Sequence, residues 1–133
     1  MLNKPKKKMK ELLIDNEIAK IEHDNGVIVA TWKAESVTLG SAKDSVKIRL
    51  QYTGEKPYLL LADTTAVKKI SKEARTYLGS KEGCERVKHC AIVVNSSLGA
   101  MIVNFFMRIN KPLVPTKLFS EKSAAHKWLT AIK

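Results

Sequence analysis

The sequence predicts a single α/β domain in which a mixed sheet is covered by about four helices. Two apolar runs, residues 57–63 and 89–94, suit central strands that are covered on both faces. Segments with helical spacing alternate with these runs, which indicates parallel strands joined by right-handed crossovers. Asn25-Gly26 is a hairpin turn signal between two segments that contain β-branched residues, so an antiparallel edge is expected. The expected order is β-β-α-β-α-β-α-β-α, a mixed sheet opened by a hairpin.

Turn and capping residues place the elements of the first half. The hairpin strands are expected at residues 17–23 and 27–33, because both turn residues tolerate positive φ. Thr38 is suited to cap a helix over residues 39–52, which Gly54 ends. Apolar residues recur along this helix at helical spacing and predict one buried stripe: Leu39, Ala42, Val46 and Leu50.

The second half contains three more helices and a last strand. Ser71 is suited to cap a short helix that runs to about Gly79. A longer helix is expected over residues 97–110, and Pro112 follows its end. A strand near residues 116–119 precedes a final helix with one apolar face, made of Ala124, Ala125, Trp128, Leu129 and Ile132.

The helix over residues 97–110 has more apolar surface than one core contact needs. Six apolar residues span an arc of about 140° and form the expected core face: Leu98, Met101, Ile102, Phe105, Phe106 and Ile109. Val103 and Met107 fall opposite that arc with Ala100 beside them, and Arg108 lies at a polar edge. This second face is covered by another segment of the chain, by a second copy in a homodimer, or by an apolar ligand or membrane surface.

Charge is the main peculiarity of the composition. The 133 residues hold 24 Lys and Arg against 13 Asp and Glu, a formal net charge of +11. The first ten residues contain no acid and five lysines, namely Lys4, Lys6, Lys7, Lys8 and Lys10. We therefore expect a flexible basic arm over residues 1–12 and one domain over 13–133. The arm is either a solvated tail or a contact for an anionic membrane surface. Nucleic acid is disfavoured because the aromatic residues are expected in the core.

Residues that carry catalytic or metal chemistry are sparse. Cys84 and Cys90 lack the spacing of a zinc site and are expected to be small, partly buried thiols, so no metal or other cofactor is predicted. Asp63 ends a buried strand, where it either caps a turn or acts with a histidine such as His89 in a small enzyme. Ser96-Ser97 either caps the third helix or holds an anion. The absence of a catalytic motif favours a protein that is not an enzyme.

The location follows from the N-terminal segment and the apolar runs. No run approaches the ~20 apolar residues of a membrane span, and no apolar segment of a signal peptide follows the N-terminal lysines. We therefore expect a cytoplasmic protein, with peripheral contact at the inner face of the membrane as an option.

Several segments, taken as an ordered set, carry a family resemblance. They are KPYLLLADT (56–64), ISKEAR (70–75), AIVV (91–94), NFF (104–106), NKP (110–112), KLF (117–119) and AxxWL (125–129). Together they resemble the small STAS/SpoIIAA-like bacterial proteins over about residues 17–130. The resemblance implies a STAS-like fold, a mixed sheet opened by a hairpin with helices packed on it. For this branch it also implies an apolar ligand or association with membranes.

The resemblance also raises a regulatory alternative. Anti-sigma-factor antagonists of this fold carry a phosphorylated Ser or Thr at the start of the helix after the central strand. Their Asp-Ser-Ser-Gly-like pattern is absent here, Lys72 stands near the phosphoacceptor position, and Ser71 is one residue away. The resemblance therefore leaves Ser71 as the candidate for a phosphorylation-controlled switch.

The expected function is a non-enzymatic binding or regulatory module that acts through the apolar helix over residues 97–110. Its ligand is a partner protein, an apolar ligand or a membrane surface. The residues expected to make the contact are Ala100, Val103, Phe106, Met107 and Arg108. A switch at Ser71 and a small enzyme of unknown reaction are the alternatives.

Overall fold

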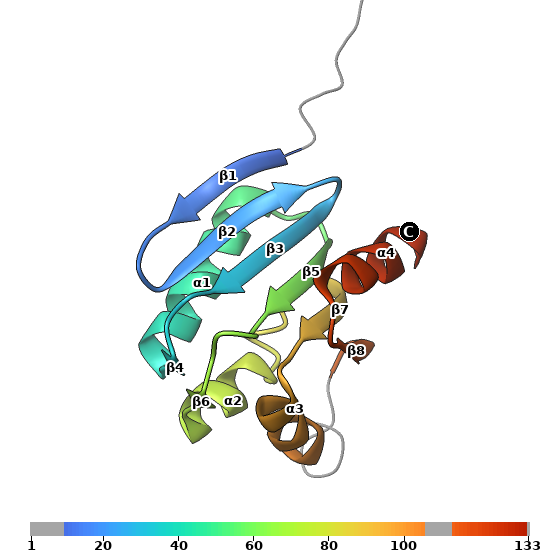
Figure 1. Ribbon diagram of the computed structural model, residues 1–133. Helices are drawn as coiled ribbons and strands as arrows, with labels where there is room; N and C mark the ends of the chain where they lie inside the picture. The colour runs from blue at the N-terminus through green and yellow to red at the C-terminus, as the bar shows by residue number, and fades with distance from the viewer. Residues whose placement is uncertain (1–9, 106–112, 133) are drawn as a thin grey trace, which may run out of the picture.

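Six strands form one sheet in the computed structural model, which describes residues 10–105 and 113–132 (Figure 1). Their spatial order is β1-β2-β3-β5-β7-β8, and their bounds are Lys10–Asp15, Ala19–Asp24, Val27–Trp32, Tyr58–Asp63, Val87–Val93 and Thr116–Phe119. The first three strands pair antiparallel, and β3, β5, β7 and β8 run parallel. The predicted mixed sheet with an antiparallel opening is confirmed.

The turn between β2 and β3 has the backbone that its residues favour. Asn25 has φ 54° and Gly26 has φ 87°, both in the left-handed region. The strands pair outward from this turn, with Asp24 opposite Val27. Because a two-residue turn fixes the register of a hairpin, the prediction of this hairpin from Asn25-Gly26 is confirmed.

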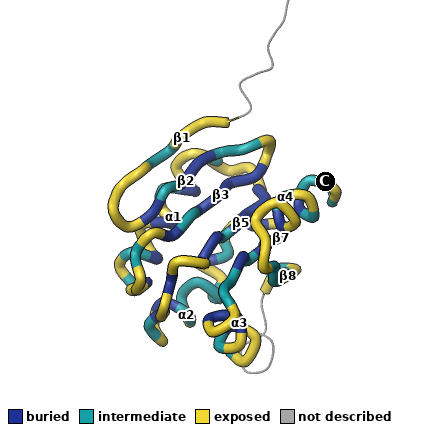
Figure 2. Tube along the Cα trace, in the orientation of Figure 1, coloured by how far each residue is buried: buried dark blue, intermediate teal, exposed yellow. Residues whose placement is uncertain are grey.

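Helices cover both faces of the sheet. Their bounds are Leu39–Thr53 for α1, Lys72–Leu78 for α2, Ser96–Ile102 for α3 and Lys122–Ile132 for α4. Leu129 of α4 packs with Leu61 on one face, whereas Ile48 of α1 packs with Leu60 on the other. Successive residues of a strand point to opposite faces, so a strand covered on both sides is apolar throughout. Figure 2 shows the buried core strands and the exposed outer sides of the helices.

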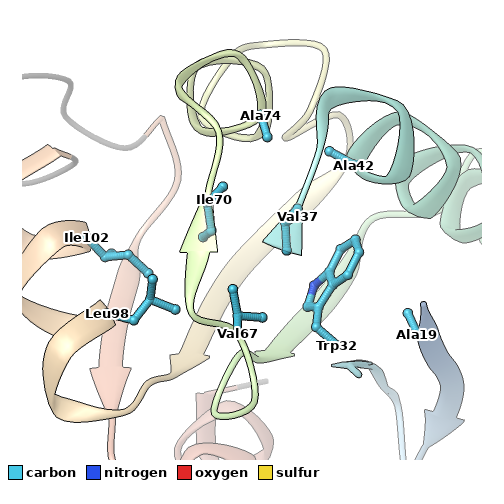
Figure 3. Packing of buried hydrophobic residues seen from close by; sticks show 9 residues of the cluster. All are labelled: Ala19, Trp32, Val37, Ala42, Val67, Ile70, Ala74, Leu98 and Ile102. Carbon is cyan, nitrogen blue, oxygen red and sulfur yellow. The ribbon is translucent and has the colours of Figure 1, made fainter. Parts of the chain in front are cut away.

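A second, two-stranded sheet is an addition that the sequence does not predict. Its strands β4 and β6, Ser36–Val37 and Lys69–Ile70, pair in parallel. Val37 and Ile70 belong to one buried cluster with Trp32 of β3 and with Leu98 and Ile102 of α3 (Figure 3). Strands of two residues are too short to produce an alternating pattern in the sequence.

The capping residues of α1 act as predicted. Thr38 Oγ1 accepts a hydrogen bond from the Ser41 amide at 3.1 Å, and Ser41 Oγ accepts one from the Thr38 amide at 3.0 Å. Ala42 and Val46 of the predicted stripe are buried, while Leu39 and Leu50 at its ends are only half-buried. The same inward face also buries Ser45 and Arg49, which a stripe drawn from apolar residues omits.

The end of the predicted basic arm is part of a strand. Lys10 begins β1, so residues 10–12 of the expected arm belong to a strand, and residues 1–9 lie outside the described part of the chain. Two contacts fix this strand: Tyr52 Oη donates to Glu11 Oε1 at 3.0 Å, and Lys33 forms an ion pair with Asp15. The alternation of β1 is weak because its apolar residues, Leu12, Leu13 and Ile14, follow one another directly.

The third predicted helix is confirmed at its start. α3 begins at Ser96, one residue before the expected position, and Asn95 caps it through a hydrogen bond from the Leu98 amide to Oδ1 at 2.8 Å. The described helix ends at Ile102, and residues 103–105 continue in a wider turn. The rest of the predicted helix, from residue 106 onward, lies outside the described residues.

Candidate ligand-binding cavity

An apolar cavity of about 110 Å³ lies between the sheet and the helices on the α1 side. The sheet contributes even-numbered residues of β3, β5, β7 and β8 together with Val87 at the start of β7. The opposite wall comes from α1, α2 and the segment between α2 and β7. Large apolar side chains supply much of its surface, among them Trp32, Val37, Leu60, Ile70, Ile92 and Ile102. Figure 3 shows four of these in the buried cluster, from β3, β4, β6 and α3.

Arg49 is the charged residue in this apolar lining. The inward face of α1 carries it into the core one turn after Ser45, and only 2% of its surface is exposed. Its Nε and Nη1 atoms are buried and donate to no group among the described residues. Its Cζ lies 6.0 Å from the centre of the Tyr58 ring. Buried arginines are ordinarily paired, so this guanidinium needs an explanation.

The surroundings of Arg49 add further donors. Tyr58 is 6% exposed, and its buried hydroxyl has no hydrogen-bond partner among the described residues. Burial raises the pKa of Tyr58, and the positive charges of Arg49 and Arg86 oppose that rise. Arg86 is paired through Nη1 with Glu85 Oε2 at 2.9 Å, on the more exposed side of this region. Arg49 therefore has a contact with the Tyr58 ring but no anionic partner among the described residues.

Both cysteines line the cavity as free thiols. Cys84 Sγ donates to the Leu78 carbonyl at 3.3 Å, which ties the loop after α2 to that helix. Burial raises the pKa of the Cys90 thiol to about 12, and it also raises the pKa of Cys84. The prediction of small, partly buried thiols is confirmed, and these thiols are protonated at neutral pH.

Gly83 allows the loop after α2 to form this wall. A Cβ added at this position would lie 2.2 Å from the Tyr77 carbonyl oxygen and 2.9 Å from Leu78 Cα. No side chain fits between the loop and the end of α2. The glycine therefore sets how closely Cys84, which follows it, approaches the cavity.

The two predicted contact residues that the structure describes at α3 do not line this cavity. Ala100 and Val103 are exposed, and they line a separate open groove of about 540 Å³ with Asn95, Gly99 and Leu118. The inward face of the same helix contributes Ile102 to the cavity. The remaining predicted contacts, Phe106, Met107 and Arg108, lie outside the described residues.

The other candidate residues have structural positions that the geometry explains. Ser71 Oγ accepts from the Ala74 amide at 3.0 Å and caps α2. Asp63 Oδ1 accepts from the amide and hydroxyl of Thr65, which is the predicted turn contact. His89 pairs in register with Leu59, four residues before Asp63, so the two side chains stand about 13 Å apart along the sheet. The hypothesis of an Asp63–His89 pair in an active site is therefore wrong.

The described residues contain no group of three or more His, Cys, Asp and Glu side chains that is arranged to hold a metal ion. Across the same residues, no helix is long and apolar enough to cross a membrane. Of the five predicted arm lysines only Lys10 is described, and it is exposed on the edge strand β1. Lys4, Lys6, Lys7 and Lys8 lie outside the described part of the chain.

The sheet order, its antiparallel opening and the helices on both faces define a SpoIIAA-like α/β module, as the resemblance implies. The structure is similar to a crystal structure described as an uncharacterized protein of the DUF3478 family with a SpoIIAA-like fold from Shewanella loihica PV-4. That similarity covers 95% of this chain and 99% of the other, with a TM-score of 0.58 and 17% sequence identity.

The family of the chain is defined by its sequence. Residues 20–133 match the domain of unknown function DUF7793, and the chain belongs to that family. No curated protein matches it. The likeness to the solved structure confirms the predicted STAS/SpoIIAA-like fold.

Arg49 is the residue of this site that sequence reasoning missed. It stands seven positions after Ala42 and three after Val46, on the face that those two residues share. Positions with this spacing lie on one side of a helix. A charged residue inside a predicted buried face is itself a signal of a functional site, and it was available in the sequence.

Proposed function

We propose that this protein is a non-enzymatic module that binds a small apolar ligand in the cavity between the sheet and α1. The supporting observation is an apolar cavity of about 110 Å³ next to the core. Well-packed protein interiors contain few voids larger than a water molecule, and dry apolar cavities of roughly 150 Å³ bind molecules such as benzene. The proposal keeps the predicted apolar ligand but places it in this cavity, which the inner face of α3 helps to line, and not on the outer face of α3.

Toluene is a suitable first probe, because it is apolar and about as large as the cavity. Trp32 lines the cavity, whereas Trp128 packs on the opposite face of the sheet with Phe119. In a Trp128→Phe background, the remaining tryptophan therefore reports on the cavity. Toluene is expected to change its fluorescence in a saturable manner and to raise the melting temperature.

A substitution that fills the cavity with a larger side chain tests whether toluene binds there. Ala62 lines the cavity on β5, and Ala62→Leu is expected to abolish the toluene response while the far-ultraviolet circular dichroism is retained. Ala131→Leu adds the same side chain at an exposed position of α4 and is expected to bind toluene like the parent protein. Toluene binding that survives Ala62→Leu, or no binding by the parent protein, would contradict the proposal.

The other predicted roles stay predictions of the sequence. They are contact with a partner protein or a second copy through Ala100 and Val103, contact of the basic arm with an anionic membrane, and a switch at Ser71. The exposure of Val103, at 41%, agrees with the predicted second face of α3. The hydrogen bond of Ser71 to the Ala74 amide agrees with a capping role.

A further inference from the structure

We infer that the ligand of this cavity is a small monocarboxylic acid whose carboxylate binds Arg49 and whose apolar body fills the remaining space. The inference rests on the proposed function and specifies the chemistry of the ligand. It starts from a charge in an apolar site: Arg49 is 2% exposed, lines the cavity, and leaves Nε and Nη1 without a partner among the described residues. A guanidinium keeps its charge in a protein, and a buried charge is costly unless it is paired.

The neighbours of Arg49 do not supply the missing anion. The side chains whose charges interact with it are Tyr58, Tyr77, Cys84 and Cys90. Burial raises the pKa of each of these groups, so all four are neutral at pH 7. No carboxylate of the described residues forms an ion pair with Arg49. Glu85, on the same side of the molecule, pairs with Arg86 instead.

The balance of charge and apolar surface selects the ligand class. One unpaired guanidinium matches one negative charge, which a carboxylate carries and a phosphate monoester exceeds. The apolar walls disfavour a small inorganic anion, because such an ion leaves them without contacts. A neutral apolar molecule fills the walls but leaves the guanidinium unpaired. A carboxylate on a compact apolar body satisfies both the guanidinium and the apolar walls.

Volume limits the size of the apolar body. At about 110 Å³ the cavity accepts a single ring or a short chain rather than a long acyl chain. Benzoate and hexanoate are therefore the probes of choice, with benzyl alcohol as the neutral partner of benzoate. Dodecanoate tests whether a long acyl chain is accepted instead.

The test compares these probes by isothermal titration calorimetry on three proteins. The parent protein is expected to bind benzoate at least about tenfold more tightly than benzyl alcohol, since a charge-assisted hydrogen bond is stronger than a neutral one. Arg49→Met is expected to lose that preference while it still binds benzyl alcohol and toluene. Lys47→Met, which removes one charge from the exposed side of the same helix, is expected to keep it.

The outcomes separate this inference from the proposed function. Binding of toluene and benzyl alcohol without a preference for benzoate supports the cavity and overturns the carboxylate assignment. Equal weakening of every probe by Arg49→Met makes Arg49 a structural residue and also overturns it. Binding of dodecanoate more tightly than hexanoate overturns the limit on size. No binding of any probe overturns both the cavity function and its ligand class.

Discussion

Replacing Arg49 with methionine is expected to stabilise the ligand-free protein. Methionine keeps an unbranched apolar side chain on the buried face of α1 and removes two buried nitrogen atoms that have no partner among the described residues. A buried unsatisfied polar group costs about 1–3 kcal/mol, and a charged one costs more. Most substitutions of buried residues destabilise, so a gain in stability is a distinctive result.

The magnitude follows from two opposing effects. Relief of the unpaired guanidinium contributes about 2–3 kcal/mol. The shorter methionine enlarges the cavity, which costs about 1 kcal/mol at roughly 24 cal/mol per Å³ of added space. The net expectation is a gain of about 1–2 kcal/mol in the free energy of unfolding. For a domain of this size, that gain raises the melting temperature by about 3–10 °C.

Urea unfolding followed by circular dichroism measures this change, with the ligand-free state secured by refolding and dialysis. Lys47→Met serves as the control on the exposed side of α1 and is expected to change the stability by less than about 0.5 kcal/mol. A saturating carboxylate probe stabilises the parent protein by mass action and is expected to do so far less for Arg49→Met. A ligand-free Arg49→Met protein that is less stable than the parent would refute the reasoning, because Arg49 would then have partners or packing contacts that it needs.

Two further predictions concern the wall between α2 and β7. Burial raises the pKa of Cys90 to about 12 and also raises the pKa of Cys84, so both thiols are protonated at pH 8. Both are therefore expected to react with iodoacetamide more slowly than free cysteine, and their reaction rates are expected to rise toward pH 11. Benzoate is expected to slow the reaction of Cys84 further. If the native protein reacted at pH 8 as fast as the protein unfolded in urea, the burial of the two thiols would be contradicted. Gly83→Ala is expected to lower the free energy of unfolding by about 1–3 kcal/mol, because its Cβ would lie 2.2 Å from the Tyr77 carbonyl oxygen. Gly40→Ala in α1 is the control, because a Cβ added there would lie 3.9 Å from its nearest neighbour, Thr38 Oγ1. This substitution is expected to leave the free energy of unfolding unchanged or to raise it in the same urea experiment.

The fold was predictable because local signals in this chain agree with the tertiary structure. Asn25-Gly26 forms the hairpin turn, Thr38 and Ser71 cap their helices, and the apolar run before Asp63 forms a central strand. Each of these signals acts over a few residues and specifies an element that packing then retains. The two-residue strands β4 and β6 have no comparable signal, since they form only when Val37 and Ile70, which are far apart in the sequence, become neighbours in the folded chain.

The site was less predictable because the sequence argument followed apolar residues alone. It found the second face of α3, where Ala100 and Val103 are indeed exposed, but it could not find a cavity. A cavity is the space left after several elements pack, and here α1, α2, α3 and four strands of the main sheet all contribute to its walls. The charged residue in that wall was visible in the sequence, although its lack of a partner was not.

Arg49 affects both the stability of the fold and the proposed binding of a ligand. An isolated buried charge lowers the stability of the empty protein, and a hydrophobic residue of similar size at the same position would avoid that cost. The position itself does not require arginine, because the neighbouring inward residues of α1 are Ala42, Ser45 and Val46. Under the proposal, Arg49 destabilises the protein when the cavity is empty and is paired when a carboxylate fills it. Such a residue makes the free energy of unfolding depend more strongly on the ligand. The stability of this protein is therefore expected to depend on its ligand more strongly than the small size of the cavity alone implies.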